Sequence, residues 1–193
     1  MKVEIPVVGA QRLVNSGVVV LVTTKYRDRV NVMTASWVTA VSGTPPLVGV
    51  SVHRGTLTHD LIVQSEEFVI NIPWVGLAEQ VQRCGELSGW EVEDKLEEVG
   101  LRADDATYVE APLIEECLGH LECAVVRTLD LDDHTFFVGQ IVAAQVEEEA
   151  FDAESWVLDE EELKPLQHLG GQYYGVSAGR FIPPYHPPEE EEL

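Results

Sequence analysis

The sequence predicts a mainly β fold with flanking helices, in which the sheet closes into a barrel. Short runs rich in Val, Ile, Thr and Trp recur through its first part, separated by Arg-Asp, Gly-Thr-Pro-Pro and Gly-Thr turn signals. Two longer strand-like runs follow in the second half, joined by an Asp-Leu-Asp-Asp-His turn. Many short strands with frequent turns are typical of a barrel.

The first part of the chain alternates strands with one short helix. Strands are expected at Val18–Thr24, Val30–Val41, Leu47–Val52 and Phe68–Ile72. Between the last two, Thr56–Ser65 predicts a helix, because Leu57, Leu61 and Ile62 recur at helical spacing. Thr56 or Thr58 can cap its first turn.

The second part adds helices before the strand pattern resumes. From Gly76 to Leu101 the sequence is acidic and helical, with a second short helix around Asp94–Val99 that Gly100 ends. Further strands are expected at Leu113–Cys117, Leu121–Leu131 and Thr135–Val146. The acidic segment Glu147–Glu162 is expected to be an exposed loop or helix.

The length and composition fit one domain. The chain has 193 residues, of which 45% are hydrophobic, enough for a sizeable core. We expect a single domain over residues 1–180 and a solvated, Pro- and Glu-rich tail over residues 181–193. No run reaches the roughly 20 apolar residues of a membrane span, and Glu4 and Pro6 interrupt any signal-peptide core. The expected location is cytoplasmic, without a membrane partner.

Charge is unevenly distributed along the chain. The net charge is −22, yet the first 60 residues hold six Lys or Arg against three acids. Nucleic acids and anionic membranes require positive charge on their partner. The balance therefore argues against both, while the locally basic N-terminal third can still bind a small anion.

The cysteines and histidines do not predict a metal site. Cys84, Cys117 and Cys123 lack CxxC spacing, so they are either buried thiols or, for one of them, a redox thiol. His53, His59 and His168 are not spaced as ligands on one helix face.

Two polar stretches interrupt the apolar runs. In His53-Arg54-Gly55-Thr56-Leu57-Thr58, a guanidinium and two hydroxyls gather where a helix begins, which suits a phosphate. A capped helix with one surface arginine explains the same residues.

The second stretch is Asn31 and Met33-Thr34-Ala35-Ser36-Trp37, whose small residues would let a planar ligand approach the backbone. Trp37 would then pack against the ring of that ligand. In the alternative interpretation, Trp37 is a core aromatic residue and the hydroxyls face solvent.

Taken in order, these stretches and several later ones resemble the flavin reductase-like, FMN-binding split-barrel family, in particular its flavoredoxin branch. The matching motifs are NVMTASW from Asn31, PPLV from Pro45, THDLIVQSEEFVINIP from Thr58, GELSGWEVEDK from Gly85, LEC from Leu121, DHTFFVG from Asp133 and PLQHLGGQY from Pro165. The resemblance covers the chain from about Val18 to Tyr174.

The resemblance implies a six-stranded split β-barrel with flanking helices that forms a homodimer and holds FMN near the subunit interface. Its cofactor-binding residues would be Asn31, Thr34, Ala35, Ser36 and Trp37 at the flavin, Ser51, Arg54 and Thr58 at the phosphate and ribityl chain, Lys95 as a cation near the flavin, and Tyr173 or Tyr174 over the ring. His134 would be catalytic, placed where a nicotinamide stacks; a solvated turn histidine is the alternative.

The function implied is an FMN-binding flavoprotein oxidoreductase. It would accept hydride or electrons from NAD(P)H or a redox partner and pass them to flavin, a ferric complex or another acceptor. NAD(P)H would bind only transiently, because the chain lacks a GxGxxG fingerprint. Two alternatives stay open: an FMN-binding electron carrier or flavin-storage module, and a split barrel that has lost its cofactor.

Overall fold

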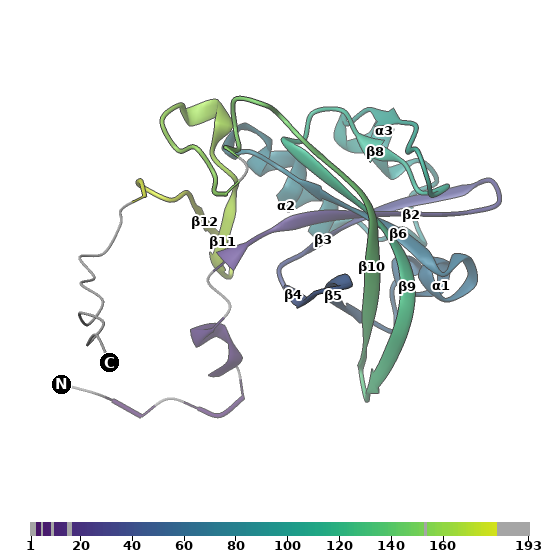
Figure 1. Ribbon diagram of the computed structural model, residues 1–193. Coiled ribbons are helices and arrows are strands. Elements are labelled where there is room, and N and C mark those ends of the chain that lie inside the picture. The colour runs from purple at the N-terminus through teal and green to yellow at the C-terminus, as the bar shows by residue number, and fades with distance from the viewer. Residues whose placement is uncertain (1–2, 5, 9, 15–16, 153, 181–193) are drawn as a thin grey trace, which may run out of the picture.

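A seven-stranded antiparallel sheet forms the body of the protein, as seen in the computed structural model, which describes residues 3–4, 6–8, 10–14, 17–152 and 154–180 (Figure 1). Its strands are β2 (Val20–Tyr26), β3 (Arg29–Ala35), β4 (Val38–Gly43), β5 (Pro46–His53), β6 (Glu67–Ile72), β9 (Gly119–Leu131) and β10 (His134–Val146). They lie in the order β3-β2-β6-β9-β10-β5-β4. The prediction of a mainly β fold with flanking helices is confirmed, but the main sheet has seven strands rather than six, because the run predicted as one strand over Val30–Val41 forms both β3 and β4.

The two edges of this sheet are neighbours in the sequence. Strands β3 and β4 stand at opposite ends of the sheet order, yet only Ser36 and Trp37 separate them. The sheet therefore curls until its edges approach, and the Ser51 amide donates to the Trp37 carbonyl at 2.9 Å. Because β3 and β4 do not pair with each other, the barrel is split at this seam.

The single strand predicted over Val30–Val41 is wrong, because the chain leaves one edge of the sheet after Ala35 and joins the other at Val38. Both halves have high β propensity, and the link contains neither Gly nor Pro. The sequence therefore does not reveal that the chain pairs with β2 before the link and with β5 after it.

The long apolar runs reflect burial on both faces of the sheet. In β2, Val20 and Val22 point into the barrel with Phe68 and Phe137, whereas Leu21, like Val19 just before the strand, joins the core beneath the helices. Alternate side chains of a strand point to opposite faces. A strand covered on both sides is thus apolar throughout.

Three α-helices flank the barrel: α1 (Leu57–Ser65), α2 (Ala78–Glu86) and α3 (Lys95–Val99). The Thr56 hydroxyl accepts from the His59 amide and caps α1, and the Asp94 carboxylate accepts from the Glu97 amide and caps α3. Short 3-10 turns lie at η1 (Ala10–Leu13), η2 (Val75–Leu77) and η3 (Glu161–Leu163). The helical stretch expected from Gly76 to Leu101 is thus two α-helices and a turn.

Small sheets complete the fold. Strand β11 (Gln167–Gly170) pairs with β1 (Gly17–Val18) and with β12 (Tyr173–Gly175), and β7 (Ala103–Asp104) pairs with β8 (Leu113–Ile114). Beyond the main body, the β9–β10 hairpin projects as a long arm (Figure 1).

The acidic segment is mostly irregular, apart from η3, and it is not wholly exposed. Ala150 is buried, and the rings of Phe151 and Trp156 contact each other with centroids 5.6 Å apart. The predicted tail over residues 181–193 lies outside the described residues. None of the helices described is long and apolar enough to cross a membrane.

Candidate functional site

A cavity of about 270 Å³ opens between β3, the first turn of α1 and the segment that joins α2 to α3. It contains four of the residues predicted to bind the cofactor. Its lining consists of Asn31, Met33, Thr34, Gly55, Thr56, Leu57, Thr58, Cys84, Gly85, Glu86, Leu87, Ser88, Gly89, Trp90 and Lys95. We call it the lysine pocket.

Lys95 is the cation of the lysine pocket, whose lining also includes Glu86. The residue is only 4% exposed, and among the described residues its ammonium has neither an ion pair nor a hydrogen bond. Burial lowers the pKa of Lys95 below its ordinary value. An unpaired buried cation is costly, so a phosphate or another anion in the pocket would supply the missing partner.

Asn31 and Thr58 fix the floor of the pocket. The Asn31 amide Nδ2 donates to the Thr58 hydroxyl at 2.7 Å, and both residues are buried. Thr58 belongs to the first turn of α1, whose backbone amides have no partners within the helix. These amides lie at the end of the helix dipole that favours anions.

The segment from Leu87 to Val92 forms the outer wall and is held at three points. The Arg29 guanidinium donates to the Gly89 carbonyl at 2.6 Å, and the Trp90 indole Nε1 donates to the Gly55 carbonyl at 3.0 Å. Gly89 packs so closely that a Cβ there would lie 2.4 Å from Asn31 Oδ1. The wall is therefore shaped before any ligand arrives.

A second group of predicted residues forms an aromatic cluster at the seam of the barrel. The ring of His134 lies 4.9 Å from that of Trp37 and 5.2 Å from that of His53. His134 Nδ1 is 2.8 Å from Asp133 Oδ1, and this contact lowers the pKa of Asp133. The Gly55 amide donates to His53 Nδ1 at 3.0 Å, which links the cluster to the rim of the lysine pocket.

Arg54 points elsewhere. Its guanidinium lies 2.7 Å from Asp130 and donates from Nε to the Thr135 hydroxyl at 3.3 Å. These residues, with His59, line a separate cavity of about 350 Å³. The hydrogen bond from Arg54 lowers the pKa of Asp130. Arg54 is thus already paired, whereas Lys95 is not.

The remaining predicted residues lie around these two groups. The Thr34 hydroxyl donates to the Val81 carbonyl of α2, and Ala35 is buried in the barrel core. Ser36 sits in the link across the seam and Ser51 contacts that link through its backbone.

The two candidate tyrosines have different surroundings. Tyr174 packs against the core beneath α2 and donates to Gln82 Oε1 at 2.8 Å, and Gln82 donates in turn to Glu86 of the pocket lining. Tyr173 is exposed. Tyr174 is therefore the one connected to the pocket.

Sequence reasoning missed Arg29, His53 and the wall residues Ser88 and Trp90 as parts of the site. Within the motif GELSGWEVEDK, the sequence predicts only Lys95 as a cofactor-binding residue. The sequence feature that indicates this wall is the cluster Ser88-Gly89-Trp90 shortly before Lys95. Such a stretch is too polar for the core and too short for a helix.

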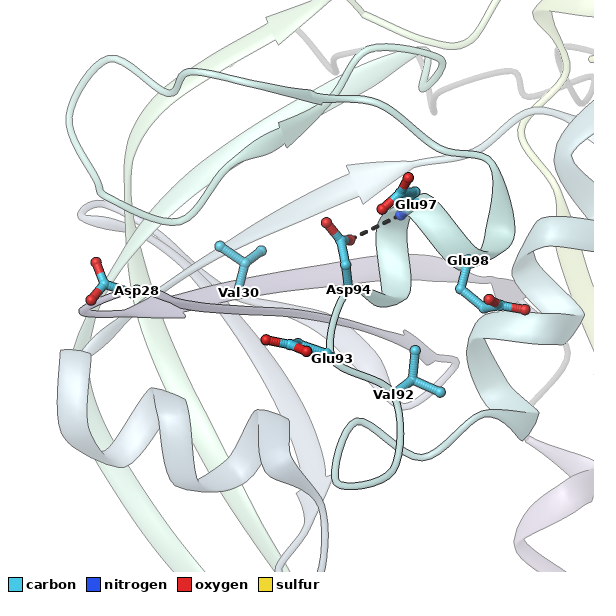
Figure 2. Close-up of a pocket in the computed structure, with 7 residues that line it drawn as sticks. All are labelled: Asp28, Val30, Val92, Glu93, Asp94, Glu97 and Glu98. Atoms are coloured by element: carbon cyan, nitrogen blue, oxygen red, sulfur yellow. Dashed lines mark hydrogen bonds between the residues drawn. The ribbon is translucent and has the colours of Figure 1, made fainter.

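A larger cavity, about 760 Å³, lies beside α3 and does not suit an anion (Figure 2). Carboxylates dominate its lining of Asp28, Val30, Val92, Glu93, Asp94, Glu97 and Glu98. Within the described part of the chain, no three His, Cys, Asp or Glu side chains gather to hold a metal ion. All three cysteines are buried and free, and burial raises the pKa of Cys84 to about 11.

Comparison with known proteins agrees with this geometry. The sequence pattern of the flavin reductase like domain matches residues 12–177. The chain therefore belongs to the flavin reductase-like family, and the resemblance seen in its motifs is confirmed.

Related proteins include one from Archaeoglobus fulgidus, uncharacterised, that is 41% identical over 115 residues, which cover 60% of this chain and 64% of that protein. An NADH-dependent FAD reductase of Streptomyces globisporus is 30% identical over 112 residues, covering 58% of this chain and 60% of that protein. Over these stretches, the match thus spans just under two thirds of each relative.

Solved structures superpose over nearly the whole chain. Flavoredoxin of Desulfovibrio vulgaris (Miyazaki F) has a TM-score of 0.80 at 28% identity, covering 94% of this chain and 96% of that one. The FMN-binding protein from Thermus thermophilus with bound p-hydroxybenzaldehyde has a TM-score of 0.79 at 26% identity, covering 95% and 98%. The split-barrel fold is thereby confirmed.

Proposed function

We propose that the protein is an FMN-binding oxidoreductase that takes hydride or electrons from NAD(P)H or a redox partner and passes them to flavin, a ferric complex or another acceptor. The observation that carries this proposal is Lys95, a buried residue that lines a pocket beside the first turn of α1 and whose ammonium has no ion pair or hydrogen bond among the described residues. Bound FMN would supply the one- and two-electron chemistry that amino-acid side chains lack.

The residues present suit the anionic part of FMN. Lys95 would neutralise phosphate charge, and the hydroxyl of Thr58, oriented by Asn31, would supply a hydrogen bond. Ser88 lines the same pocket and offers a further hydroxyl. Because Arg54 is engaged by Asp130, Lys95 is assigned the main charge, and Arg54 and Ser51 are left a lesser role near the ribityl chain.

The flat part of the cofactor would lie along the segment Thr34-Ala35-Ser36-Trp37, where small side chains leave the backbone accessible. Tyr174, or failing that Tyr173, would border it. His134 would orient a donor against the ring: its contact with Asp133 fixes the imidazole, and Trp37 packs beside it. We assign His134 the transfer step and the other residues to binding.

Spectroscopy of the purified protein tests the proposal. A flavin spectrum, or tight binding of added FMN by apoprotein, is expected. Anaerobic stopped-flow mixing with NADH and with NADPH should bleach the flavin absorbance. A colourless protein that does not bind FMN would overturn the proposal as a whole, whereas bound FMN that neither nucleotide reduces would leave only the second candidate.

That second candidate is an FMN-binding electron carrier or flavin-storage module without NAD(P)H oxidation. The net charge of −22 favours it, since free nucleotides are anions and would be repelled at long range. A redox protein with a basic surface would be attracted instead. Reduction by such a protein but not by NADH or NADPH is the expected result under this candidate.

The quaternary structure belongs to the same proposal. An apolar groove beside β4, lined by Val18, Val38, Leu47 and Ile141 among others, has a volume of about 270 Å³. We expect a second copy of the chain to cover it in a cytoplasmic homodimer built on a domain of residues 1–180. Light scattering on the purified protein should give twice the chain mass of 21.4 kDa.

A further inference from the structure

Trp90 is placed unusually for a large aromatic side chain. It is 55% exposed, yet it lines the same pocket as Lys95. Its indole nitrogen is held by the Gly55 carbonyl at 3.0 Å, so the polar edge of the ring is satisfied while more than half of the side chain still faces outward.

The wall that carries Trp90 is held rigidly from behind. Arg29 donates to the carbonyls of Gly89 at 2.6 Å and Val92 at 3.4 Å, on either side of the tryptophan. A surface aromatic residue that is fixed in advance loses little conformational entropy when a second ring stacks on it. The core gains little from this arrangement, because the exposed part of Trp90 packs against nothing in the described chain.

Charge also limits which molecule fits. Immediately beyond Trp90, the carboxylates of Glu93, Asp94 and Glu97 turn toward the acidic cavity on the other side of the loop (Figure 2). A bound phosphate would be drawn to Lys95 and repelled from that side. A group attached to the phosphate would therefore be directed along the wall toward Trp90, where an aromatic face is available.

We propose that Trp90 is a stacking platform for the adenine of a dinucleotide whose phosphates occupy the lysine pocket. The inference rests on the proposed function and deepens it, because it names Trp90 as the residue that gives an adenine-containing flavin or donor additional affinity. The adenine of NADH has the same chemistry, so the experiment separates the two sources.

The first arm compares FMN and FAD binding to apoprotein by fluorescence titration. Trp90→Ala should raise the Kd of FAD about 10-fold, within the range for loss of base stacking on an aromatic side chain, and should raise the Kd of FMN, which has no adenine, by a much smaller factor. Trp90→Phe removes the indole N–H but keeps an aromatic face. Because stacking requires only that face, this variant should restore FAD binding. Tyr108→Ala, which removes a residue that is 71% exposed and outside the pocket, is the matched control and should change neither Kd.

The second arm measures KM for NADH with FMN-loaded protein. A KM raised in Trp90→Ala and restored in Trp90→Phe, with the FAD Kd unchanged, assigns the platform to the adenine of the donor. An equal loss of FMN and FAD affinity would show that Trp90 only supports the wall, and it would overturn the inference. Unchanged FAD Kd and unchanged KM would overturn it as well. If wild-type protein binds neither flavin, the proposed function itself fails.

Discussion

The proposed cofactor binding and protein stability make opposite demands on Lys95. The residue is buried beside Cys84, and its ammonium has no counter-ion in the described chain. Burying a charge without a partner costs free energy in the apoprotein, and an anionic ligand recovers that cost. A residue that destabilises the empty protein in this way is better explained by a ligand than by the fold.

Replacing Lys95 with methionine, which is apolar and similar in length, separates the two demands. We expect Lys95→Met to raise the Kd of FMN by about 10- to 100-fold, the value of one charge-assisted hydrogen bond. The free energy of unfolding of the apoprotein should stay equal or rise. Fluorescence titration and urea unfolding measure these quantities.

Arg54→Ala is the comparison, since it removes a cation that is already paired with Asp130. It should raise the Kd of FMN much less. A larger loss for Arg54→Ala than for Lys95→Met would move the phosphate to the cavity near Asp130.

The lowered pKa of Lys95 predicts how the stability of the apoprotein depends on pH. At low pH the side chain is protonated in both the folded and the unfolded states. As the pH rises through the lowered pKa, the folded protein loses this proton while the unfolded chain keeps it up to about pH 10.4. Stability from this site therefore increases with pH in that window.

Urea unfolding at several alkaline pH values, wild type minus Lys95→Met, isolates the contribution of Lys95. The free energy of unfolding of the wild type should rise with pH relative to that of Lys95→Met. If it fell instead, the assignment of Lys95 as a desolvated ammonium would be wrong.

His134 is expected to act on transfer more than on binding. His134→Ala should slow flavin reduction by the physiological donor and leave the Kd of FMN nearly unchanged, because the ring contacts Trp37, His53 and Asp133 rather than the lysine pocket. Stopped-flow reduction rates and FMN titration measure the two effects. Unchanged reduction rates would remove the histidine from the transfer step.

At the scale of elements, helix α3 places the lysine. Lys95 is its first residue, and the Asp94 carboxylate accepts from the Glu97 amide at 3.0 Å to start the helix there (Figure 2). Asp94 and Glu97 also bring negative charge to the cavity next door. Asp94 therefore positions Lys95 by capping α3, in addition to adding negative charge to the neighbouring cavity.

Two substitutions distinguish the cap from the charge. Asp94→Ala should destabilise the protein by about 1 kcal/mol and weaken FMN binding, because the first turn of α3 loses its side-chain acceptor. Asp94→Asn keeps a capping group and should be close to wild type in both urea unfolding and FMN titration. If Asn were as damaging as Ala, the carboxylate charge rather than the cap would be the important feature.

The sequence predicts most helices and strands because their apolar residues recur at regular spacing. The apolar spacing of Leu57, Leu61 and Ile62 and the cap at Thr56 locate α1 to within one residue. The break between Ala35 and Val38 was not predictable in this way, since it depends on which distant strand each half pairs with. The wall at Trp90 was missed for a similar reason: its contacts with Arg29 and Gly55 join residues far apart in the chain.

For the whole molecule, the net charge of −22 affects how partners approach. Each nucleotide donor is an anion, and NADPH carries more charge than NADH, so the protein repels NADPH more strongly. Salt screens this repulsion over a distance of about 10 Å at 0.1 M. Under the proposed function, ionic strength therefore affects association with a nucleotide donor.

The second-order rate constant for flavin reduction should rise with salt, and more steeply for NADPH than for NADH. Stopped-flow measurements between 10 mM and 200 mM salt, a range chosen to span the change in screening, test this. A rate constant that falls with salt would mean that the basic residues of the N-terminal third dominate the field at the site.

The seam of the barrel is closed covalently rather than by a ladder of hydrogen bonds. Ser36 and Trp37 join the outermost strands, and three Cα–Cα steps span at most about 11 Å. The length of this two-residue link thus limits how far apart the ends of β3 and β4 can lie beside the aromatic cluster. Lengthening this link one residue at a time offers a graded way to widen the mouth of the barrel and admit bulkier electron acceptors.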